Sequence, residues 1–290
     1  MLFQGTGTAI ITPFTRHSEV DYASLKKILD NQIKNGIDAI ILLGTTGESP
    51  VISLDERKKL TEFTMEQVGG KAKVIVGTGT NDTKKVVELN KIAEQYKVDA
   101  LLIVNPYYNK GTQQSLVEHY KYISERTSLP IVLYNVPSRT GMNMLPETLV
   151  KIHSECKNVV GVKEACGNIS QIAHLFSIKP DSFAVYSGND DNTFPVMAFG
   201  GEGVVSVFSN AYPKEKKQLT DALLKGDLVT ARKLNNKYLN MMHLLFAEAS
   251  PAPIKFVMSK LGMCENILRL PLAPVTQQTE KLLLEEMKKY

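Results

Sequence analysis

A lysine interrupts the short apolar run Val159-Val160-Gly161-Val162-Lys163-Glu164-Ala165. The run is rich in β-branched residues and does not alternate polar with apolar positions, which is typical of a buried parallel strand. Lysine is almost never buried without a partner or a chemical use. An amine that loses solvation shifts towards its neutral form, which is the nucleophile that forms a Schiff base with a ketone. Lys163 is therefore a candidate nucleophile; the alternative is that it lies just past the strand and reaches solvent.

Polar groups that suit this chemistry follow other strand-like runs. The stretch Gly44-Thr45-Thr46-Gly47-Glu48-Ser49 places two adjacent hydroxyls between glycines, and Asn105-Pro106-Tyr107-Tyr108 places two phenols side by side. Two further runs end in Tyr134-Asn135-Val136-Pro137-Ser138-Arg139-Thr140-Gly141 and in Ser187-Gly188-Asn189-Asp190-Asp191. Each stretch alone has a plain structural explanation, as turn glycines, packing tyrosines or helix caps. Their convergence around one lysine is what indicates an active site.

The residue types predict the class of substrate. Formation of a Schiff base requires loss of water from a carbinolamine, and a tyrosine hydroxyl paired with a threonine hydroxyl can carry the protons. Tyr134 is the candidate for that role. The planar guanidinium of Arg139 suits bidentate contact with a carboxylate, and the main-chain amides and hydroxyls of Thr45 and Thr46 suit a second one. We expect an acidic keto substrate.

Other chemistries have less support. The five histidines are scattered without paired spacing, so no metal site is predicted. No G-x-S-x-G stretch is present, which gives hydrolase chemistry no support. The stretch Gly201-Glu202-Gly203-Val204-Val205-Ser206 falls where many barrels bind phosphate, but no basic residue accompanies it there, so a phosphorylated substrate is not expected.

The elements that must position these groups alternate between two patterns. Short apolar strands are predicted at Thr8–Phe14, Ala39–Gly44, Lys73–Gly77, Ala100–Asn105, Pro130–Asn135, Val159–Lys163, Ser182–Ser187 and Gly203–Phe208. Amphipathic helices are predicted at Asp21–Asn35, Ser53–Val68, Asp82–Tyr96, Gln113–Thr127, Pro146–Ser154, Ile169–Ile178, Asn192–Phe199 and Pro213–Leu224. Ser53 and Glu56 have the spacing of a capping box, Asp21 and Asp82 are candidate N-caps, and Pro213 suits a first turn.

Eight such units favour an α/β fold of the closed (β/α)8 TIM-barrel type. An open dinucleotide-binding sheet would require G-x-G-x-x-G after an early strand, and in Gly77-Thr78-Gly79-Thr80-Asn81-Asp82 an aspartate replaces the third glycine. From about residue 227 only helices are predicted: Asp227–Ala247, Pro251–Leu261 and Thr276–Lys289. We therefore expect a catalytic barrel over residues 1–226 and a small C-terminal α-helical domain over residues 227–290.

Composition limits the remaining function classes. The 290 residues carry a net charge of +4 and no basic block with interleaved aromatics, so neither nucleic acid nor a membrane surface is an expected partner. Three cysteines without metal-ligand spacing indicate reduced thiols. The N-terminus lacks the order of a signal peptide and no apolar run reaches membrane-spanning length, so a cytoplasmic location is expected.

The quoted stretches, together with Gly161-Val162-Lys163-Glu164-Ala165, resemble the signature stretches of the dihydrodipicolinate synthase (4-hydroxy-tetrahydrodipicolinate synthase) family. The resemblance runs in order over essentially the whole chain. The wider superfamily of pyruvate-dependent Schiff-base lyases, which includes N-acetylneuraminate lyase, shares the G-x-x-G-E motif, the Tyr-Asn stretch and the lysine. Arg139 after Pro137-Ser138 and the Thr45-Thr46 and Tyr107-Tyr108 pairs favour the synthase.

The resemblance implies a reaction and roles for its residues. Lys163 would form an imine with pyruvate, whose enamine attacks L-aspartate β-semialdehyde to give 4-hydroxy-tetrahydrodipicolinate on the route to diaminopimelate and lysine. Tyr134, Thr45 and Tyr108 would form a proton relay, with Tyr108 supplied by an adjacent subunit of a homotetramer. The substrate-binding groups would be Thr46 for the pyruvate carboxylate, Arg139 for the semialdehyde carboxylate, and the main chain of Gly188 and Val205. No metal or organic cofactor is implied.

Departures from the family pattern concern regulation. Lysine-inhibited members carry histidines after the first motif and a glutamate after the Gly-Thr-Gly loop, where this chain has Leu54, Arg57 and Lys85. A cationic Lys85 repels the ammonium groups of lysine, so weak or absent feedback is expected. Two other functions stay open on the sequence: another pyruvate-dependent lyase such as N-acetylneuraminate lyase, and a barrel that only binds a ligand.

Overall fold

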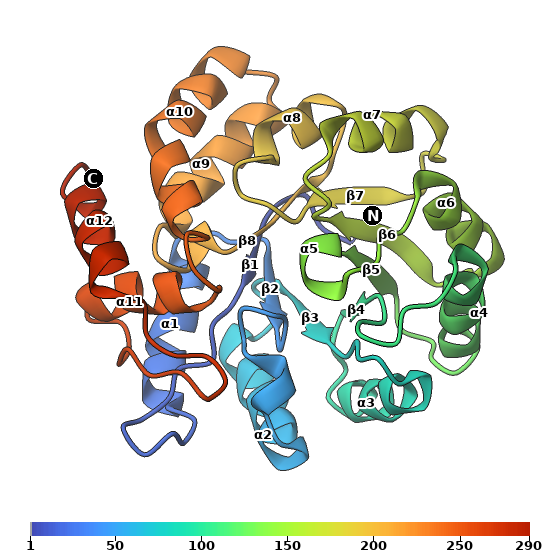
Figure 1. Ribbon diagram of the computed structural model, residues 1–290, viewed down its shortest axis with the longest axis horizontal. Helices are drawn as coiled ribbons and strands as arrows, with labels where there is room; N and C mark the ends of the chain where they lie inside the picture. Colours follow the sequence, from blue (N-terminus) through green and yellow to red (C-terminus); the bar gives the residue numbers. More distant parts are fainter. Residues whose placement is uncertain (1) are drawn as a thin grey trace.

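Eight parallel strands close into a barrel in sequence order, surrounded by helices (Figure 1). The computed structural model describes residues 2–290. The strands are β1 (Gly5–Ala9), β2 (Ala39–Leu42), β3 (Lys73–Gly77), β4 (Ala100–Val104), β5 (Ile131–Asn135), β6 (Val159–Glu164), β7 (Ala184–Ser187) and β8 (Gly203–Ser206). The predicted (β/α)8 barrel is confirmed.

The helices of the barrel lie outside the strands (Figure 1). They are α1 (Tyr22–Lys34), α2 (Leu54–Val68), α3 (Thr83–Gln95), α4 (Gln113–Ser124), α6 (Pro146–Glu155), α7 (Ile169–Ile178), α8 (Thr193–Ala198) and α9 (Pro213–Leu224). The predicted helix starts are confirmed in detail. Ser53 Oγ accepts from the Glu56 amide, while the Glu56 carboxylate accepts from the Ser53 amide at 2.9 Å. Asp21 and Asp82 accept from main-chain amides as N-caps.

The first strand was predicted three residues too late. Ile10–Phe14 is the more apolar part of that stretch, yet β1 is Gly5–Ala9 and pairs with β8 through Gly5 and Gly203. A Cβ atom on Gly203 would lie 2.0 Å from the carbonyl oxygen of Gly5. The barrel therefore closes where the backbones of β1 and β8 approach too closely for side chains, which requires glycine. Because glycine is not counted as apolar, a search for apolar runs does not detect this strand.

Three short elements were not predicted. They are the four-residue helix α5 (Pro137–Thr140) and the 3-10 turns η1 (Ser49–Val51) and η2 (Phe208–Asn210). Each is one turn or less, so it contains no periodic pattern that a sequence could reveal. All three follow a strand at its carboxyl end, on the face of a barrel where active sites lie.

Apolar side chains pack in two layers. One fills the barrel interior and includes Ile41, Ile75, Leu102, Tyr134 and Tyr186. The other, much larger, lies between the strands and the helices. The interior is thus a packed core, and the pockets lined by Lys163 and Tyr134 lie at its carboxyl end.

The chain continues into three helices: α10 (Leu228–Leu244), α11 (Ala252–Lys260) and α12 (Gln277–Met287). Figure 1 shows them in orange and red beside the barrel, on the side where α1 and α9 lie. The helix-only character predicted for this part is confirmed. The division into two domains between residues 226 and 227 stays a prediction. Helix α11 is buried over Ala252–Met258, and its Lys255 contacts Glu48 in the loop after β2, so the extension packs directly on the barrel.

Candidate active site

Lys163 extends into the carboxyl end of the barrel from β6. It pairs with Tyr134 on β5 and with Tyr186 on β7. Its Nζ lies 4.1 Å from the centre of the Tyr134 ring, and the residue is only 4 % exposed. Strand alternation turns the next residue, Glu164, to the opposite face. Lys163 is therefore a buried lysine inside the barrel, and the alternative that it reaches bulk solvent past the strand is wrong.

An open cavity of about 310 Å³ surrounds the amine. Its polar lining includes residues from four separate strand ends, namely Thr45, Thr46, Tyr134, Ser138, Arg139, Lys163, Gly188 and Asn189. A second pocket of about 210 Å³ shares Thr45, Tyr134 and Arg139 with the first and continues towards Ser49 and Tyr107. Six predicted site residues thus meet around one cavity: Lys163, Tyr134, Thr45, Thr46, Arg139 and Gly188.

The loop after β2 holds the two threonines. Three main-chain amides of the loop donate to carbonyls of the same loop. The amides of Gly47 and Ser49 donate to the Gly44 carbonyl, and the Glu48 amide donates to the Thr45 carbonyl. Thr12 Oγ1 donates to the Gly47 carbonyl at 2.8 Å. Because the backbone is tied at several points, the hydroxyls of the threonines are held at the rim of the cavity.

Arg139 is placed by the helical turn α5. Pro137 at the first position presets the turn, and Thr140 Oγ1 donates to the Val136 carbonyl. The Arg139 guanidinium lies at the cavity and its Nη2 donates to the Ser250 carbonyl at 3.3 Å. It therefore presents a cation to the cavity that the threonines also line, and it has no carboxylate partner among the ion pairs of residues 2–290.

Two predicted residues lie away from the cavity of their own chain. Tyr108 is 91 % exposed, has a left-handed φ of +69°, and does not line either pocket, whereas its neighbour Tyr107 lines the second. Val205 is buried in β8 and contributes to the interior core, while Val207 lines the cavity instead. Their predicted roles stay predictions.

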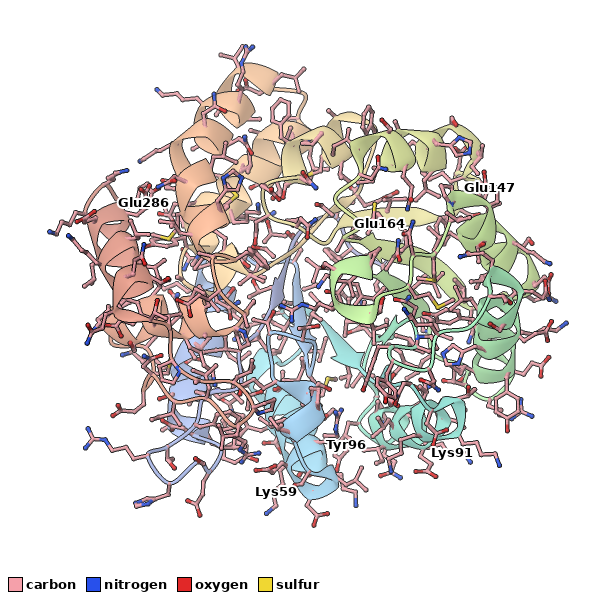
Figure 2. All side chains as sticks on the ribbon, in the orientation of Figure 1. Lys59, Lys91, Tyr96, Glu147, Glu164 and Glu286 are labelled. Atoms are coloured by element: carbon pink, nitrogen blue, oxygen red, sulfur yellow. The ribbon has the colours of Figure 1, made fainter. Side chains whose placement is uncertain are left out.

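A buried carboxylate stands behind the lysine. Glu164 accepts from Asn135 Nδ2 at 3.0 Å and from the Cys166 amide at 2.8 Å, and Figure 2 shows it within the outline of the molecule, whereas Glu147 lies at the edge. Burial raises the pKa of Glu164 although these hydrogen bonds oppose the shift. Burial and the nearby Glu164 raise the pKa of Cys166 to about 12, so its thiol stays protonated at neutral pH.

A second buried cluster holds the loop after β7. Asp190 accepts from Ser206 Oγ, from the amides of Val207 and Phe208, and from Lys216 Nζ at 2.9 Å. Burial alone raises the pKa of Asp190, but Lys216 and these hydrogen bonds outweigh it, and the pKa lies below its ordinary value. The ionised carboxylate thereby fixes Val207, which lines the cavity.

The sequence reasoning missed the contribution of the C-terminal extension. Phe246, Glu248, Ala249 and Ser250 line the cavity together with the strand ends. They follow a helix and not a strand, so the rule that directs attention to strand ends does not reach them. The prolines at 251 and 253 were the only local signal, and they mark a break in the helices without indicating a site.

Neither a metal cluster nor a membrane helix is found in the described part of the chain. Over residues 2–290 no three His, Cys, Asp or Glu side chains are grouped to hold a metal ion. None of the helices in the same range has the length and apolar character that crossing a bilayer requires.

Known proteins were compared with the chain at the level of sequence and fold. The Dihydrodipicolinate synthetase family profile matches residues 2–289. A protein of Fervidobacterium nodosum named 4-hydroxy-tetrahydrodipicolinate synthase is 49 % identical over 99 % of this chain and 98 % of its own. The crystal structure of dihydrodipicolinate synthase from Thermotoga maritima is 48 % identical, covers 100 % of this chain and 99 % of that one, and superposes with a TM-score of 0.98.

A solved structure with lower sequence identity contains a bound ligand. The chloride-inhibited dihydrodipicolinate synthase of Acinetobacter baumannii, complexed with pyruvate, is 36 % identical, covers 99 % of this chain and 98 % of that one, and has a TM-score of 0.97. Sequence motifs, barrel geometry and these relatives agree over the full length. The chain therefore belongs to the dihydrodipicolinate synthetase family.

Proposed function

We propose that the chain condenses pyruvate with L-aspartate β-semialdehyde, the activity for which its family and its curated relatives are named. The observation that carries this proposal is the buried Lys163 amine 4.1 Å from the Tyr134 ring, at the floor of a cavity that also presents Thr45, Thr46 and Arg139. An amine kept from solvent beside hydroxyls and a free guanidinium suits Schiff-base chemistry on an acidic ketone. The protein is thus a pyruvate-dependent enzyme of the lyase class.

The reaction proceeds through a covalent adduct on Lys163. The Nζ lone pair attacks the pyruvate C2 carbonyl, and the carbinolamine expels its oxygen as water to leave an imine. Loss of a methyl proton gives an enamine, whose carbon attacks the aldehyde carbon of the semialdehyde. The amino group of the bound semialdehyde then adds to the imine carbon and displaces the lysine, which closes the ring of 4-hydroxy-tetrahydrodipicolinate. One water is released for each pair of substrates.

Proton transfer is assigned to hydroxyl groups. The Tyr134 ring lies 4.1 Å from the amine, and Tyr134 shares the cavity with Thr45. We assign these two to a relay that removes the carbinolamine oxygen as water and returns a proton during the later steps. Tyr108, exposed on its own chain, completes the relay from a second copy in the homotetramer that we propose.

Two carboxylates are held at different sides of the cavity. We assign the pyruvate carboxylate to the Thr46 loop and the main chain at Gly188, and the semialdehyde carboxylate to Arg139. A guanidinium binds a carboxylate through two parallel hydrogen bonds, which fixes direction as well as distance. Val205 is retained as a main-chain contributor near the same site. No metal or organic cofactor is part of this proposal.

Regulation and location complete the proposal. Arg57 donates to Ser49 O and Oγ at 2.6 Å and to the Gly77 carbonyl. Its guanidinium therefore connects the loop after β2 with the end of β3. Lys85 presents a second cation nearby on α3 and pairs with Glu88. Both charges oppose the two ammonium groups of lysine, and we infer weak or absent inhibition by lysine. We place the enzyme in the cytoplasm.

Borohydride trapping tests the covalent step. The chain is incubated with pyruvate, reduced, digested and mapped by mass spectrometry, and the adduct is expected on Lys163. Lys216 and Lys255 are equally or more buried and serve as internal controls for nonspecific reduction. An adduct elsewhere, or none, would falsify the Schiff-base assignment. Comparison of semialdehyde condensation with N-acetylneuraminate cleavage then checks the substrate, and faster cleavage would exclude the synthase.

A further inference from the structure

A buried ion pair joins the loop after β2 to the C-terminal extension. Lys255 on α11 donates to Glu48 Oε1, and both side chains are completely excluded from solvent. The other oxygen of Glu48 accepts from the Arg269 amide at 3.0 Å, and Lys255 also donates to the Ile267 carbonyl at 2.8 Å. Glu48 thus receives all its charge-assisted contacts from residues more than 200 positions later in the chain.

Glu48 belongs to the loop that carries the two threonines. Only Gly47 separates it from Thr46, and its amide donates to the Thr45 carbonyl. It adopts a left-handed φ of +54°, a conformation that non-glycine residues rarely occupy unless surrounding contacts impose it. The side-chain contacts that hold Glu48 in this conformation come from Lys255 Nζ and from the Arg269 amide. The side-chain anchor therefore acts on the backbone of the threonine loop.

The segment that leads into the same helix contacts Arg139 at the cavity. Ser250 lies two residues before α11, and its carbonyl accepts from Arg139 Nη2. The Lys255 amide donates to the Pro251 carbonyl, so Ser250 and Lys255 sit on one rigid helical start. The segment that enters α11 consequently contacts Arg139, and Lys255 in the first turn of the helix holds Glu48.

Stability alone is a poor reason for this arrangement. Replacing a buried ion pair by apolar residues of similar size is often neutral or stabilising, because desolvation cancels most of the attraction. Burial lowers the pKa of Lys255, and Glu48 only partly restores it, which is the signature of that cost. The Glu48–Lys255 ion pair adds little net stability, but each of its side chains has a second defined partner, the Arg269 amide for Glu48 and the Ile267 carbonyl for Lys255. Such a pair is suited to fixing the position of the loop that carries Glu48.

We propose that α11 acts as a strut that sets the separation between the Thr45–Thr46 loop and Arg139, with Lys255 and Glu48 as positioning residues. The inference rests on the proposed function, in which the loop and Arg139 hold the carboxylates of the two substrates. Reaction between two bound substrates depends steeply on their mutual geometry, and a displacement of about 1 Å can cost on the order of a hundredfold in rate. The C-terminal extension thereby becomes part of the catalytic geometry.

Four variants test the strut. Lys255→Met and Glu48→Gln each remove one charge, and the double variant Glu48→Gln/Lys255→Met removes both while it keeps side-chain volume and the acceptor for the Arg269 amide. Glu286→Gln is the matched control, because Glu286 is a buried, ion-paired carboxylate of the same extension on α12, and Figure 2 shows it at the periphery. Each variant is measured for Tm, kcat and the KM of both substrates.

The double variant separates positioning from stability. Since no buried charge is left unpaired, its Tm should return close to the wild-type value, whereas the pyruvate KM should stay roughly tenfold or more above wild type. Glu286→Gln should keep both KM values. A double variant with restored Tm and wild-type KM for both substrates would overturn the proposal. If the single variants do not fold, the double variant alone gives this answer.

Hydrogen exchange provides a readout that does not depend on the substrate. The amides of residues 44–49 should exchange faster in the double variant than in wild type or Glu286→Gln, because the loop has lost its anchor. Equal exchange in all three would overturn the strut. Failure of the wild-type chain to condense pyruvate with the semialdehyde would instead overturn the proposed function, and the exchange result would still decide the role of α11.

Discussion

His119 on α4 gives the fold a built-in sensitivity to acid. The residue is 7 % exposed, its Nδ1 is 2.9 Å from Thr83 Oγ1, and its ring meets Tyr120 edge-on at 4.9 Å. Within residues 2–290 its Nε2 has no hydrogen-bond partner. A second proton would thus enter an apolar space without an acceptor, and burial lowers the pKa of His119 from 6.5 to about 4.

The sign and size of the effect follow from linkage. Because the folded pKa lies below the unfolded one, the unfolded chain binds more protons between these values, so stability is complete above about pH 6.5 and falls as the pH drops towards 4. The fall of the His119 pKa from 6.5 to about 4 corresponds to about 3 kcal/mol of stability over the whole window. About 2 kcal/mol of this is lost between roughly pH 7.5 and pH 5.

Urea unfolding at those two pH values tests the reasoning. The wild-type chain loses stability from His119 and from every other titrating group, whereas His119→Gln should lose about 2 kcal/mol less. His174→Gln is the matched control, because His174 is exposed and bonded to Glu147 on the surface. If His119→Gln and the control show the same pH dependence as wild type, the buried neutral histidine does not account for the acid sensitivity.

Three further predictions concern the active site. Tyr134→Phe should lower kcat by about a hundredfold or more, because the relay loses its hydroxyl, while pyruvate binding weakens much less; an unchanged kcat removes Tyr134 from the relay. Gly188→Ala should raise the pyruvate KM roughly tenfold, since its Cβ would lie 2.6 Å from Ala165 Cβ and displace the main chain beside the amine; a wild-type KM contradicts this. Added L-lysine should leave the initial rate unchanged because Lys85 is cationic, and inhibition at low lysine concentration refutes that explanation.

Much of the fold could be predicted from periodicity and caps. Helices with a clear N-cap, such as α2 after Ser53 and α3 after Asp82, were placed within a residue of their observed starts. Strands β3 and β6 were apolar enough to be placed equally well. The error at β1 arose because its sequence, Gly-Thr-Gly-Thr-Ala, is shaped by the close approach to β8, a contact some 200 residues away in sequence that no local pattern contains.

The site was predictable where a chemical group lies at the end of a strand. Lys163, Tyr134 and the threonine loop could be found in this way because parallel strands deliver their ends to one face. The lining at Phe246 and Ser250 could not, since its position depends on how α10 and α11 pack beside the barrel. The role of Tyr108 could not be tested in the same way. The side chain is exposed on its own chain, and a single chain does not show which residues of a second copy contact it.

The long sequence separation within the Glu48–Lys255 pair has a consequence for synthesis. The two residues are 207 positions apart, so at about 5 to 20 residues per second Glu48 leaves the ribosome roughly 10 to 40 s before its partner. During that interval the Glu48 carboxylate lacks its cationic partner, and the threonine loop lacks the anchor that Lys255 provides. The first catalytic loop to be made is therefore among the last to be anchored, and a nascent chain that has already closed its barrel holds its two threonines without this anchor until α11 docks.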